Sequence, residues 1–277
     1  MNSEKRLPAM FLRPLARWMT RKRQHAWMAI GVWLGVAWFV LPWTAHAETV
    51  RVAVASNFAQ PARILAKAFE TQTGHTAEIA LGATGQLFAQ IQHGAPFDVL
   101  LSADQQRPSQ LAAMAVAVAS SQFTYATGQL ALWSASPQGV DSKGAILLQA
   151  PPANTRMALA NPKLAPYGAA ALEVLDAMQV TALWQRHWVT GENIAQTHQF
   201  VASGNASLGF VALSQVMKDG QFSSGSGWIV PNALHAPIAQ DAVLLQRAAS
   251  KPAALAWMAF LKSDTAAQII QAAGYLR

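Results

Sequence analysis

The sequence predicts an α/β fold arranged in two lobes, in which mostly parallel sheets are flanked by helices. Short apolar runs alternate with stretches of helical periodicity from residue 49 to the C-terminal end. Strands that alternate with helices in this way indicate βαβ units and a mostly parallel sheet. The chain has 277 residues, of which 52% are hydrophobic and 12% charged. It can therefore bury the core of one large domain or of two modest ones.

Three strand–helix pairs are predicted in the first half of this pattern. Each pair begins with a short apolar run and continues with apolar residues at helical spacing. Pro61 is tolerated in the first turn of the first helix. The predicted strands cover 50–55, 77–82 and 97–102, and the predicted helices cover 58–69, the stretch through 87–91 and a segment near 107–117.

The second half repeats the same scheme. A Gly/Ser-rich patch at 223–227 predicts a turn, and more helix is expected beyond Ser263. The predicted strands cover 128–135, 156–162, 207–213 and 242–245. The predicted helices cover 167–178, a stretch opened by 191–193 that runs to about 202, and an amphipathic stretch at 252–261.

Most of the net charge of +7 belongs to the N-terminal segment. Residues 1–47 hold seven of the twenty Lys and Arg residues against one acid, which leaves 13 basic and 12 acidic side chains in the remainder. The body of the chain is therefore almost neutral. It also lacks the interleaved aromatic and basic residues of a nucleic-acid-binding face, so we expect no nucleic-acid partner.

Residues 1–47 have the three parts of a secretory signal peptide. A basic stretch precedes an uncharged apolar run from Ala26 to Trp43, and the segment ends in the small-x-small pattern that closes at Ala47. We expect Sec-dependent export to a bacterial periplasm with cleavage after Ala47. The alternative is an uncleaved membrane anchor, because 18 apolar residues can just span a bilayer; the chain would then be a tethered structural protein.

Few residues in the chain predict catalysis or metal binding. The absence of cysteine excludes a thiolate nucleophile and a cysteine-ligated metal. The five histidines after residue 47 do not have the spacing that places two of them on one metal ion. Asp98 and Asp104, six residues apart around a strand end, could form an acid pair, and they leave an exported hydrolase as an alternative.

A different kind of site recurs along the chain: a strand, a loop of small hydroxyl or amide residues, and the first turn of a helix. Helix N-termini leave backbone N–H groups unpaired and carry about half a positive elementary charge. Several of them facing one cleft would bind an anion without Lys or Arg. The same residue types are also ordinary helix N-caps, so the pattern alone leaves capping and ligand binding open. The loops are at 56–57, 82–85, 166–168 and 192–194.

Two long motifs resemble the periplasmic molybdate-binding proteins of bacterial ABC uptake systems, which are type II solute-binding proteins. One motif runs from Gly85 to Gln105, and the other combines GENIAQ at 191–196 with LGFVALSQ at 208–215. The resemblance extends from Glu48 to the C-terminal end. It implies a periplasmic-binding-protein fold of two lobes with the ligand in the cleft between them. The lobes would be residues 48–128 plus 237–277 and residues 129–236, after a signal peptide at 1–47.

The resemblance also implies the ligand-binding residues. Ser56 and Asn57 follow the first strand, and Thr84 supplies a second hydroxyl. Tyr167 and Ile194 match positions at which the family contributes backbone N–H groups. The oxyanion would be held through its oxygens by Ser56, Thr84, Tyr167 and Ile194. No side chain would coordinate the metal directly.

The resemblance implies that the protein binds an anion and does not catalyse a reaction. The protein would bind molybdate or tungstate as a monomer, without a cofactor, and would deliver it to an ABC permease that works with a cytoplasmic ATPase. One departure keeps another oxyanion such as sulfate as an alternative, because the loop usually written Gly-Ser-Ser-Gly reads Gly82-Ala83-Thr84-Gly85 here. Threonine retains the hydroxyl and adds a methyl group with fewer rotamers, so the pocket is expected to be slightly tighter.

Overall fold

The computed structural model describes residues 47–218 and 220–276. Almost all of the predicted export segment therefore lies outside the described residues, and so does its anchor alternative. Within the described ranges no helix has both the length and the apolar character needed to cross a bilayer.

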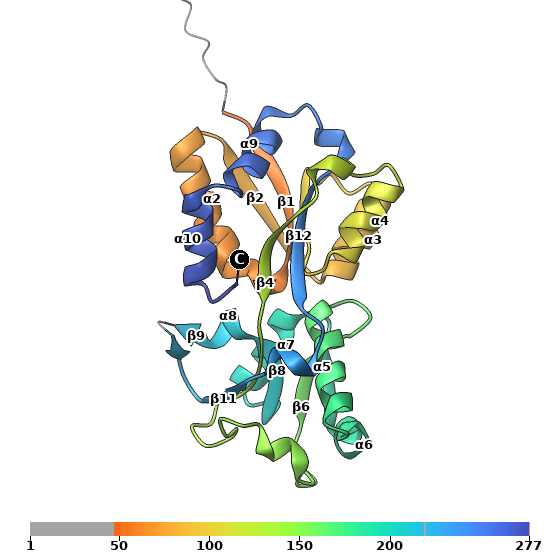
Figure 1. The fold of residues 1–277 in the computed structure, drawn as a ribbon, viewed down its shortest axis with the longest axis vertical. Helices are drawn as coiled ribbons and strands as arrows, with labels where there is room; N and C mark the ends of the chain where they lie inside the picture. The colour runs from red at the N-terminus through yellow and green to blue at the C-terminus, as the bar shows by residue number, and fades with distance from the viewer. Residues whose placement is uncertain (1–46, 219, 277) are drawn as a thin grey trace, which may run out of the picture. The chain divides into compact units, whose positions relative to one another are not determined.

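The described residues form two five-stranded sheets, each flanked by helices, which confirms the predicted fold class (Figure 1). The first sheet has the order β2-β1-β3-β12-β4. The second has the order β11-β5-β8-β6-β7, and β9 and β10 form a small separate hairpin. The strands of the first sheet are β1 (Thr49–Ala55), β2 (Thr76–Gly82), β3 (Val99–Leu101), β4 (Phe123–Gly128) and β12 (Ile238–Leu244). Those of the second sheet and the hairpin are β5 (Leu130–Ser134), β6 (Met157–Ala160), β7 (Trp188–Gly191), β8 (Leu208–Ala212), β11 (Ser226–Ile229), β9 (Met217–Lys218) and β10 (Gln221–Phe222).

Helices cover both faces of each sheet. We call the first sheet with its helices the first lobe and the second sheet with its helices the second lobe. The helices of the first lobe are α2 (Ala59–Thr73), α3 (Thr84–Gln92), α4 (Gln106–Ala113), α9 (Pro252–Phe260) and α10 (Asp264–Ala272). Those of the second lobe are α5 (Pro166–Ala177), α6 (Thr181–Trp184), α7 (Ile194–Ala202) and α8 (Leu213–Val216).

One strand in each sheet runs against the other four. In the first sheet this strand is β12, which is antiparallel to both β3 and β4; in the second it is β5, which is antiparallel to β8 and β11. Both are the first strands that the chain forms after passing from one sheet to the other. Strands β5 and β12 begin at the side of their sheet that faces the other lobe, whereas the other four strands of each sheet end at that side. The loops after the remaining strands of both lobes therefore meet between the lobes, the usual ligand position in open α/β sheets.

Alternation of side chains along the strands builds a core on each face. In β1, Val50, Val52 and Val54 pack into the apolar cluster beneath α2 and α9, and Ala53 packs into the cluster with Leu111 of α4. The second sheet divides in the same way between a cluster with α5 and a cluster with α7. This two-residue period is what a sheet buried on both faces requires.

Most predicted elements form close to their expected bounds, and the differences have physical reasons. Strand β4 was not predicted, because its Phe-Thr-Tyr-Ala-Thr-Gly sequence lacks a continuous apolar run. Strand β7 was also missed. Helix α4 ends at Ala113 because the following turn brings Ala117 into a bridge with Leu245. In the helix at 252–260 the exposed positions are Pro252, Leu255 and Ala259, which are apolar, so the predicted amphipathic pattern is wrong there.

Candidate functional site

A small cavity of about 10 Å³ lies where the loops of the two lobes meet. The structure brings all five sequence-predicted residues to its wall, three from the first lobe and two from the second. The lining residues are Ala55, Ser56, Asn57, Gly82, Ala83, Thr84, Ala103, Ala165, Pro166, Tyr167 and Ile194. None of them is charged, so any ligand held here contacts only neutral groups of the wall.

The first lobe contributes two hydroxyl groups, neither of which caps a helix. Ser56 begins a short 3₁₀ turn after β1 and makes no capping hydrogen bond. Thr84 is the first residue of α3 and is 1% exposed. Its Oγ1 accepts a hydrogen bond from the Ala103 N–H at 3.1 Å. This bond fixes the side chain and leaves the hydroxyl proton with no acceptor among the described residues. The capping alternative is therefore wrong for both hydroxyls.

The second lobe contributes two helix N-termini with open N–H groups. Helix α5 begins with Pro166, which has no N–H, so Tyr167 provides its first amide donor. In α7 the N-cap is Asn193, whose Oδ1 accepts from the N–H groups of Ala195 and Gln196, each at 3.0 Å. Capping is thus the correct interpretation for this loop. It satisfies the second and third amides of the helix and leaves the first, that of Ile194, for a ligand.

A hydrogen bond between the two lobes begins at the cavity wall. The Ser56 hydroxyl donates to Asn193 Oδ1 at 3.3 Å, a long bond that lies beside the helix cap. A ligand oxygen could take the Ser56 proton because Asn193 keeps its two amide donors. Asn193 was not predicted as a site residue, although its place one residue before a predicted helix was the available signal.

Asn57 lines the cavity but its side-chain amide is engaged elsewhere. Its Nδ2 donates to Gln240 Oε1 at 2.9 Å and to the Tyr275 hydroxyl at 3.1 Å. Gln240 also accepts from the Tyr125 hydroxyl at 3.0 Å and donates to the Tyr167 hydroxyl at 3.1 Å. The two amide protons of Asn57 thus belong to a buried network behind the cavity that connects β4, β12 and α5.

This network, which we call the tyrosine network, contains all three tyrosines of the chain. Burial raises the pKa of Tyr125 and Tyr167 well above the usual value of 10.0, and it raises the pKa of Tyr275 to about 12. The three hydroxyls therefore stay neutral and able to donate. Sequence reasoning missed Gln240, whose signal was only a polar residue before an apolar run.

The acid pair proposed as a hydrolase alternative does not form. Asp98 precedes β3 and Asp104 follows it, so the two carboxylates lie at opposite ends of that strand. Asp98 is bound to Lys251 at 2.6 Å, and Asp104 is bound to Arg107. Each carboxylate therefore stabilises a local ion pair. The described residues also contain no group of three or more His, Asp or Glu that could hold a metal ion.

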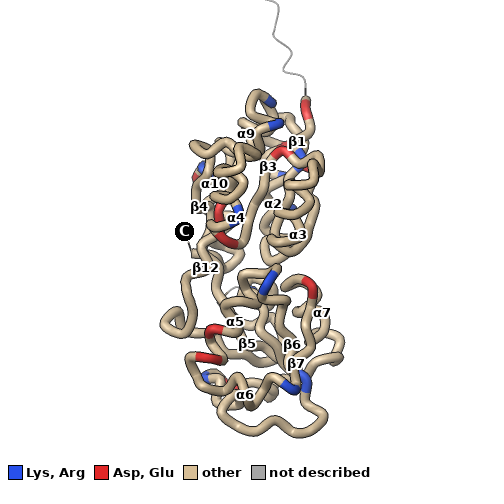
Figure 2. The backbone as a smooth tube through the Cα atoms, turned by 90° about the vertical axis from the view of Figure 1, so that its right-hand side faces the viewer, with Lys and Arg blue, Asp and Glu red and all other residues tan. Residues whose placement is uncertain are grey.

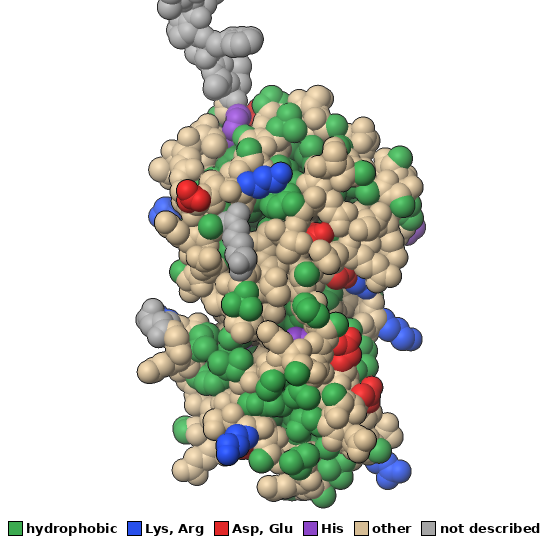
Figure 3. All heavy atoms as spheres, viewed as in Figure 1, with side chains coloured by type: hydrophobic (Ala, Val, Ile, Leu, Met, Phe, Trp, Pro, Cys, Tyr) green, Lys and Arg blue, Asp and Glu red, His purple; other side chains and the backbone are tan. Residues whose placement is uncertain are grey.

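Charged residues are sparse over the described surface. Figure 2 shows them scattered over both lobes, singly or in small groups of opposite sign. The face seen in Figure 3 likewise carries single charged side chains separated by polar and hydrophobic ones, without a continuous basic patch. Both views agree with a nearly neutral body.

Comparisons with known proteins place the chain in a family. Residues 50–276 match the family described as bacterial extracellular solute-binding protein. The molybdate-binding protein ModA of Azotobacter vinelandii is 50% identical over 236 residues, which cover 85% of this chain and 93% of that protein. ModA of Rhodobacter capsulatus is 48% identical over 233 residues, with 84% and 90% covered.

A solved structure gives the same result. The periplasmic molybdate-binding protein of Azotobacter vinelandii superposes with a TM-score of 0.79 and 38% identity, covering 82% of this chain and 99% of that one. These relatives are binding proteins and not enzymes. They therefore do not favour the alternative that this chain is an exported hydrolase. The chain belongs to the bacterial extracellular solute-binding protein family.

Proposed function

We propose that this protein captures molybdate outside the cytoplasm and delivers it to an ABC permease driven by a cytoplasmic ATPase. The observation that carries the proposal is the cavity between the lobes, which is lined by hydrogen-bond donors from both lobes and by no charged side chain. Two relatives of about 50% identity named as molybdate-binding proteins support it.

The donors suit a small anion that has only acceptors. The Ser56 and Thr84 hydroxyls and the Tyr167 and Ile194 N–H groups would each bind an oxygen of the anion. Three helices, α3, α5 and α7, begin at the cavity, and their aligned peptide dipoles add positive potential there. Neutral donors of this kind bind the anion without the desolvation cost of burying a Lys or Arg.

Proton count and size together account for the proposed selectivity. Molybdate carries no proton at neutral pH, so a ring of donors satisfies it completely. A phosphate that keeps one proton would turn an O–H toward donors, at a cost of about 1–3 kcal/mol for the unpaired buried group. Sulfate also has only acceptors and must be discriminated by its smaller size. Tungstate matches molybdate closely, so we propose that it binds as well.

We propose that the lobes consist of residues 48–128 plus 237–277 and residues 129–236 and that they close around the anion. Two connections link them: Gln129 between β4 and β5, and the segment between β11 and β12. The closed form brings together donors from both lobes, so the ligand favours that form. The permease would recognise this shape.

We also propose that residues 1–47 are a signal peptide removed by cleavage after Ala47, with release of a periplasmic monomer. Mass spectrometry of the exported protein tests the cleavage site, because the expected N-terminal residue is Glu48. A protein that retains residues 26–43 would instead be a membrane-anchored form. Size-exclusion chromatography with light scattering tests the oligomeric state.

Calorimetric titration of the exported protein with molybdate, tungstate, sulfate and phosphate tests the function. We expect tight binding of molybdate and tungstate and no measurable heat from phosphate. Tight sulfate binding without a molybdate signal would overturn the proposal. Displacement of bound molybdate by tungstate in the same cell would show that both anions use one site.

A further inference from the structure

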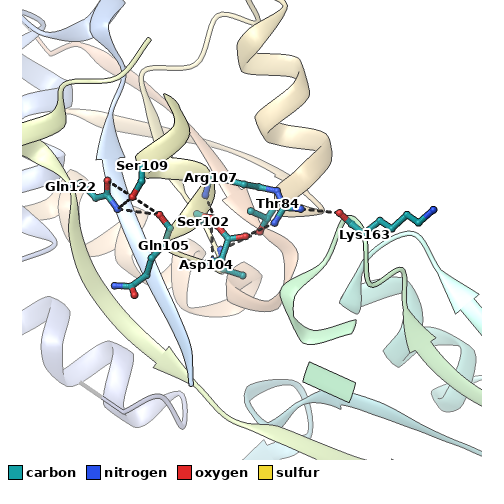
Figure 4. Close-up of polar contacts among 9 residues, drawn as sticks. Thr84, Ser102, Asp104, Gln105, Arg107, Ser109, Gln122 and Lys163 are labelled. Atoms are coloured by element: carbon teal, nitrogen blue, oxygen red, sulfur yellow. Dashed lines mark hydrogen bonds and ion pairs between the residues drawn. The ribbon is translucent and has the colours of Figure 1, made fainter. Parts of the chain in front are cut away.

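Two consecutive backbone carbonyls of the second lobe are bound by donors of the first. The loop between β6 and α5 presents the carbonyl oxygens of Lys163 and Leu164 toward the other lobe. Arg107 Nη2 donates to the Lys163 carbonyl at 2.8 Å, and the Gly85 N–H donates to the Leu164 carbonyl at 2.9 Å. Figure 4 shows the Lys163 side chain pointing away, so only its backbone takes part.

Arg107 is held in the orientation that this contact needs. Its guanidinium forms an ion pair with Asp104, and its own N–H donates to Asp104 Oδ1 at 3.0 Å. Asp104 is positioned in turn by the Ser102 hydroxyl at 3.1 Å. Both charged side chains are less than one-fifth exposed. Because Asp104 neutralises the guanidinium, Arg107 is directed at the carbonyl of the second lobe and is not available as an anion ligand.

The second donor depends on the close approach of two backbones. A Cβ placed on Gly85 would lie 3.1 Å from Leu164 Cα and 3.2 Å from Arg107 Nη2. A larger residue here would push the two lobes apart. Gly85 follows Thr84 directly, and Leu164 lies three residues before Tyr167. In each lobe, the contact therefore lies within three residues of a cavity residue in the chain. Neither donor, Gly85 or Arg107, lines the cavity itself.

We propose that Arg107 and Gly85 form a clasp that holds the two lobes closed, with Arg107 as a positioning residue that never touches the anion. The inference rests on the proposed function in one respect: molybdate is the ligand whose release rate is measured. Both donors reach their carbonyls only when the lobes are together, so the clasp stabilises the closed form selectively. A planar guanidinium can bind the carboxylate and the carbonyl at once, which a lysine cannot reproduce.

The first test compares Arg107→Met with Arg51→Met. Methionine keeps an apolar stem and removes the donors. The control removes Arg51, an exposed arginine of β1 that pairs with Glu78 of β2 on the surface of the first lobe. We expect Arg107→Met to release molybdate about 10- to 150-fold faster, in keeping with the loss of one charged hydrogen bond, with an association rate close to that of Arg51→Met. Equal release rates in the two variants would overturn the clasp.

Asp104→Asn separates the clasp from simple attraction between charges. This change leaves the protein more positive, so long-range attraction alone would tighten anion binding. The clasp predicts the opposite, because Arg107 loses its anchor and release accelerates, although less than in Arg107→Met. Tighter binding in Asp104→Asn would therefore contradict the inference.

Small-angle scattering without any anion provides a readout that is independent of the ligand. We expect Arg107→Met to have a larger radius of gyration than the wild type, with Arg51→Met unchanged. If the wild type binds no molybdate, the proposed function fails, and the scattering comparison then decides the clasp by itself. An unchanged radius of gyration in Arg107→Met would in that case overturn it.

Discussion

Replacing Thr84 by valine separates ligand binding from structural support at one atom. Valine has the same shape as threonine, but it lacks the hydroxyl. In the structure that hydroxyl accepts the Ala103 N–H at 3.1 Å, and Thr84 lines a cavity whose other polar groups include further donors. The substitution therefore removes one donor to the proposed anion and one acceptor for a buried amide, without creating a void.

The two losses have different sizes and appear in different measurements. A hydrogen bond to a charged group contributes about 1.5–3 kcal/mol, which corresponds to a rise in the molybdate Kd of about 10- to 150-fold. Leaving the buried Ala103 N–H without an acceptor costs about 1–3 kcal/mol of folding stability. For a domain of this size, each kcal/mol lowers Tm by about 2–4 °C.

Calorimetric titration with molybdate measures the first loss, and thermal unfolding without ligand measures the second. Thr84→Ser is the matched control, because it keeps both hydrogen bonds and removes only a methyl group. We expect its Kd to stay within about threefold of the wild type, a change of well under 1 kcal/mol. A folded Thr84→Val protein with unchanged Kd and a lowered Tm would show that the hydroxyl only supports Ala103, and would refute its assignment to the anion.

Three further predictions concern the pH dependence, an ion pair and a helix start. The three buried tyrosines have raised pKa values. Their contribution to folding stability is therefore complete below about pH 10 and is lost as the pH rises through their folded-state pKa values. A titration followed by absorbance at 295 nm should show no tyrosinate near pH 10 while the protein is native. Asp98→Asn breaks the pair between buried Asp98 and one-third-exposed Lys251, at the end of β3 away from the cavity. It should cost about 2–3 kcal/mol of unfolding free energy in urea, less than the roughly 3–5 kcal/mol of a fully buried pair, while the molybdate Kd should not change. Gly168→Ala places a Cβ 2.1 Å from the Ala160 carbonyl oxygen and should displace the Tyr167 N–H; calorimetry should show weaker binding, and binding of wild-type strength would contradict this role.

Local sequence patterns were enough to predict the strand–loop–helix units. Strand β1 followed by Ser56, and β2 followed by Thr84, are recognisable because apolar periodicity and small polar residues act over a few neighbouring positions. The same holds for the proline that starts α5 and for the asparagine that caps α7. Once these units pack with parallel strands, their loops must meet at one edge of each sheet, so the five candidate residues converge on one cavity.

Contacts between distant residues were decided only by the tertiary structure. The resemblance implied Asn57 as a ligand-binding residue, and the structure places it in the cavity wall with its side-chain amide protons bound by Gln240, 183 residues away in sequence, and by Tyr275. The edge strand β4 lacks a continuous apolar run, and it forms because it pairs with β12, from which the whole second lobe separates it in sequence. Local periodicity carries no information about such pairs.

The sequence by itself therefore determined the near-neutral body of the chain and predicted the α/β class. It also predicted an export signal and indicated neutral hydrogen-bond donors at helix starts. Each of these depends on composition or on residues that are neighbours in the chain. The tertiary structure decided which donors remain open, which are engaged in the tyrosine network, and where Arg107 reaches the carbonyl of Lys163. These depend on packing between segments that meet only in the folded protein, where most buried polar groups have a partner.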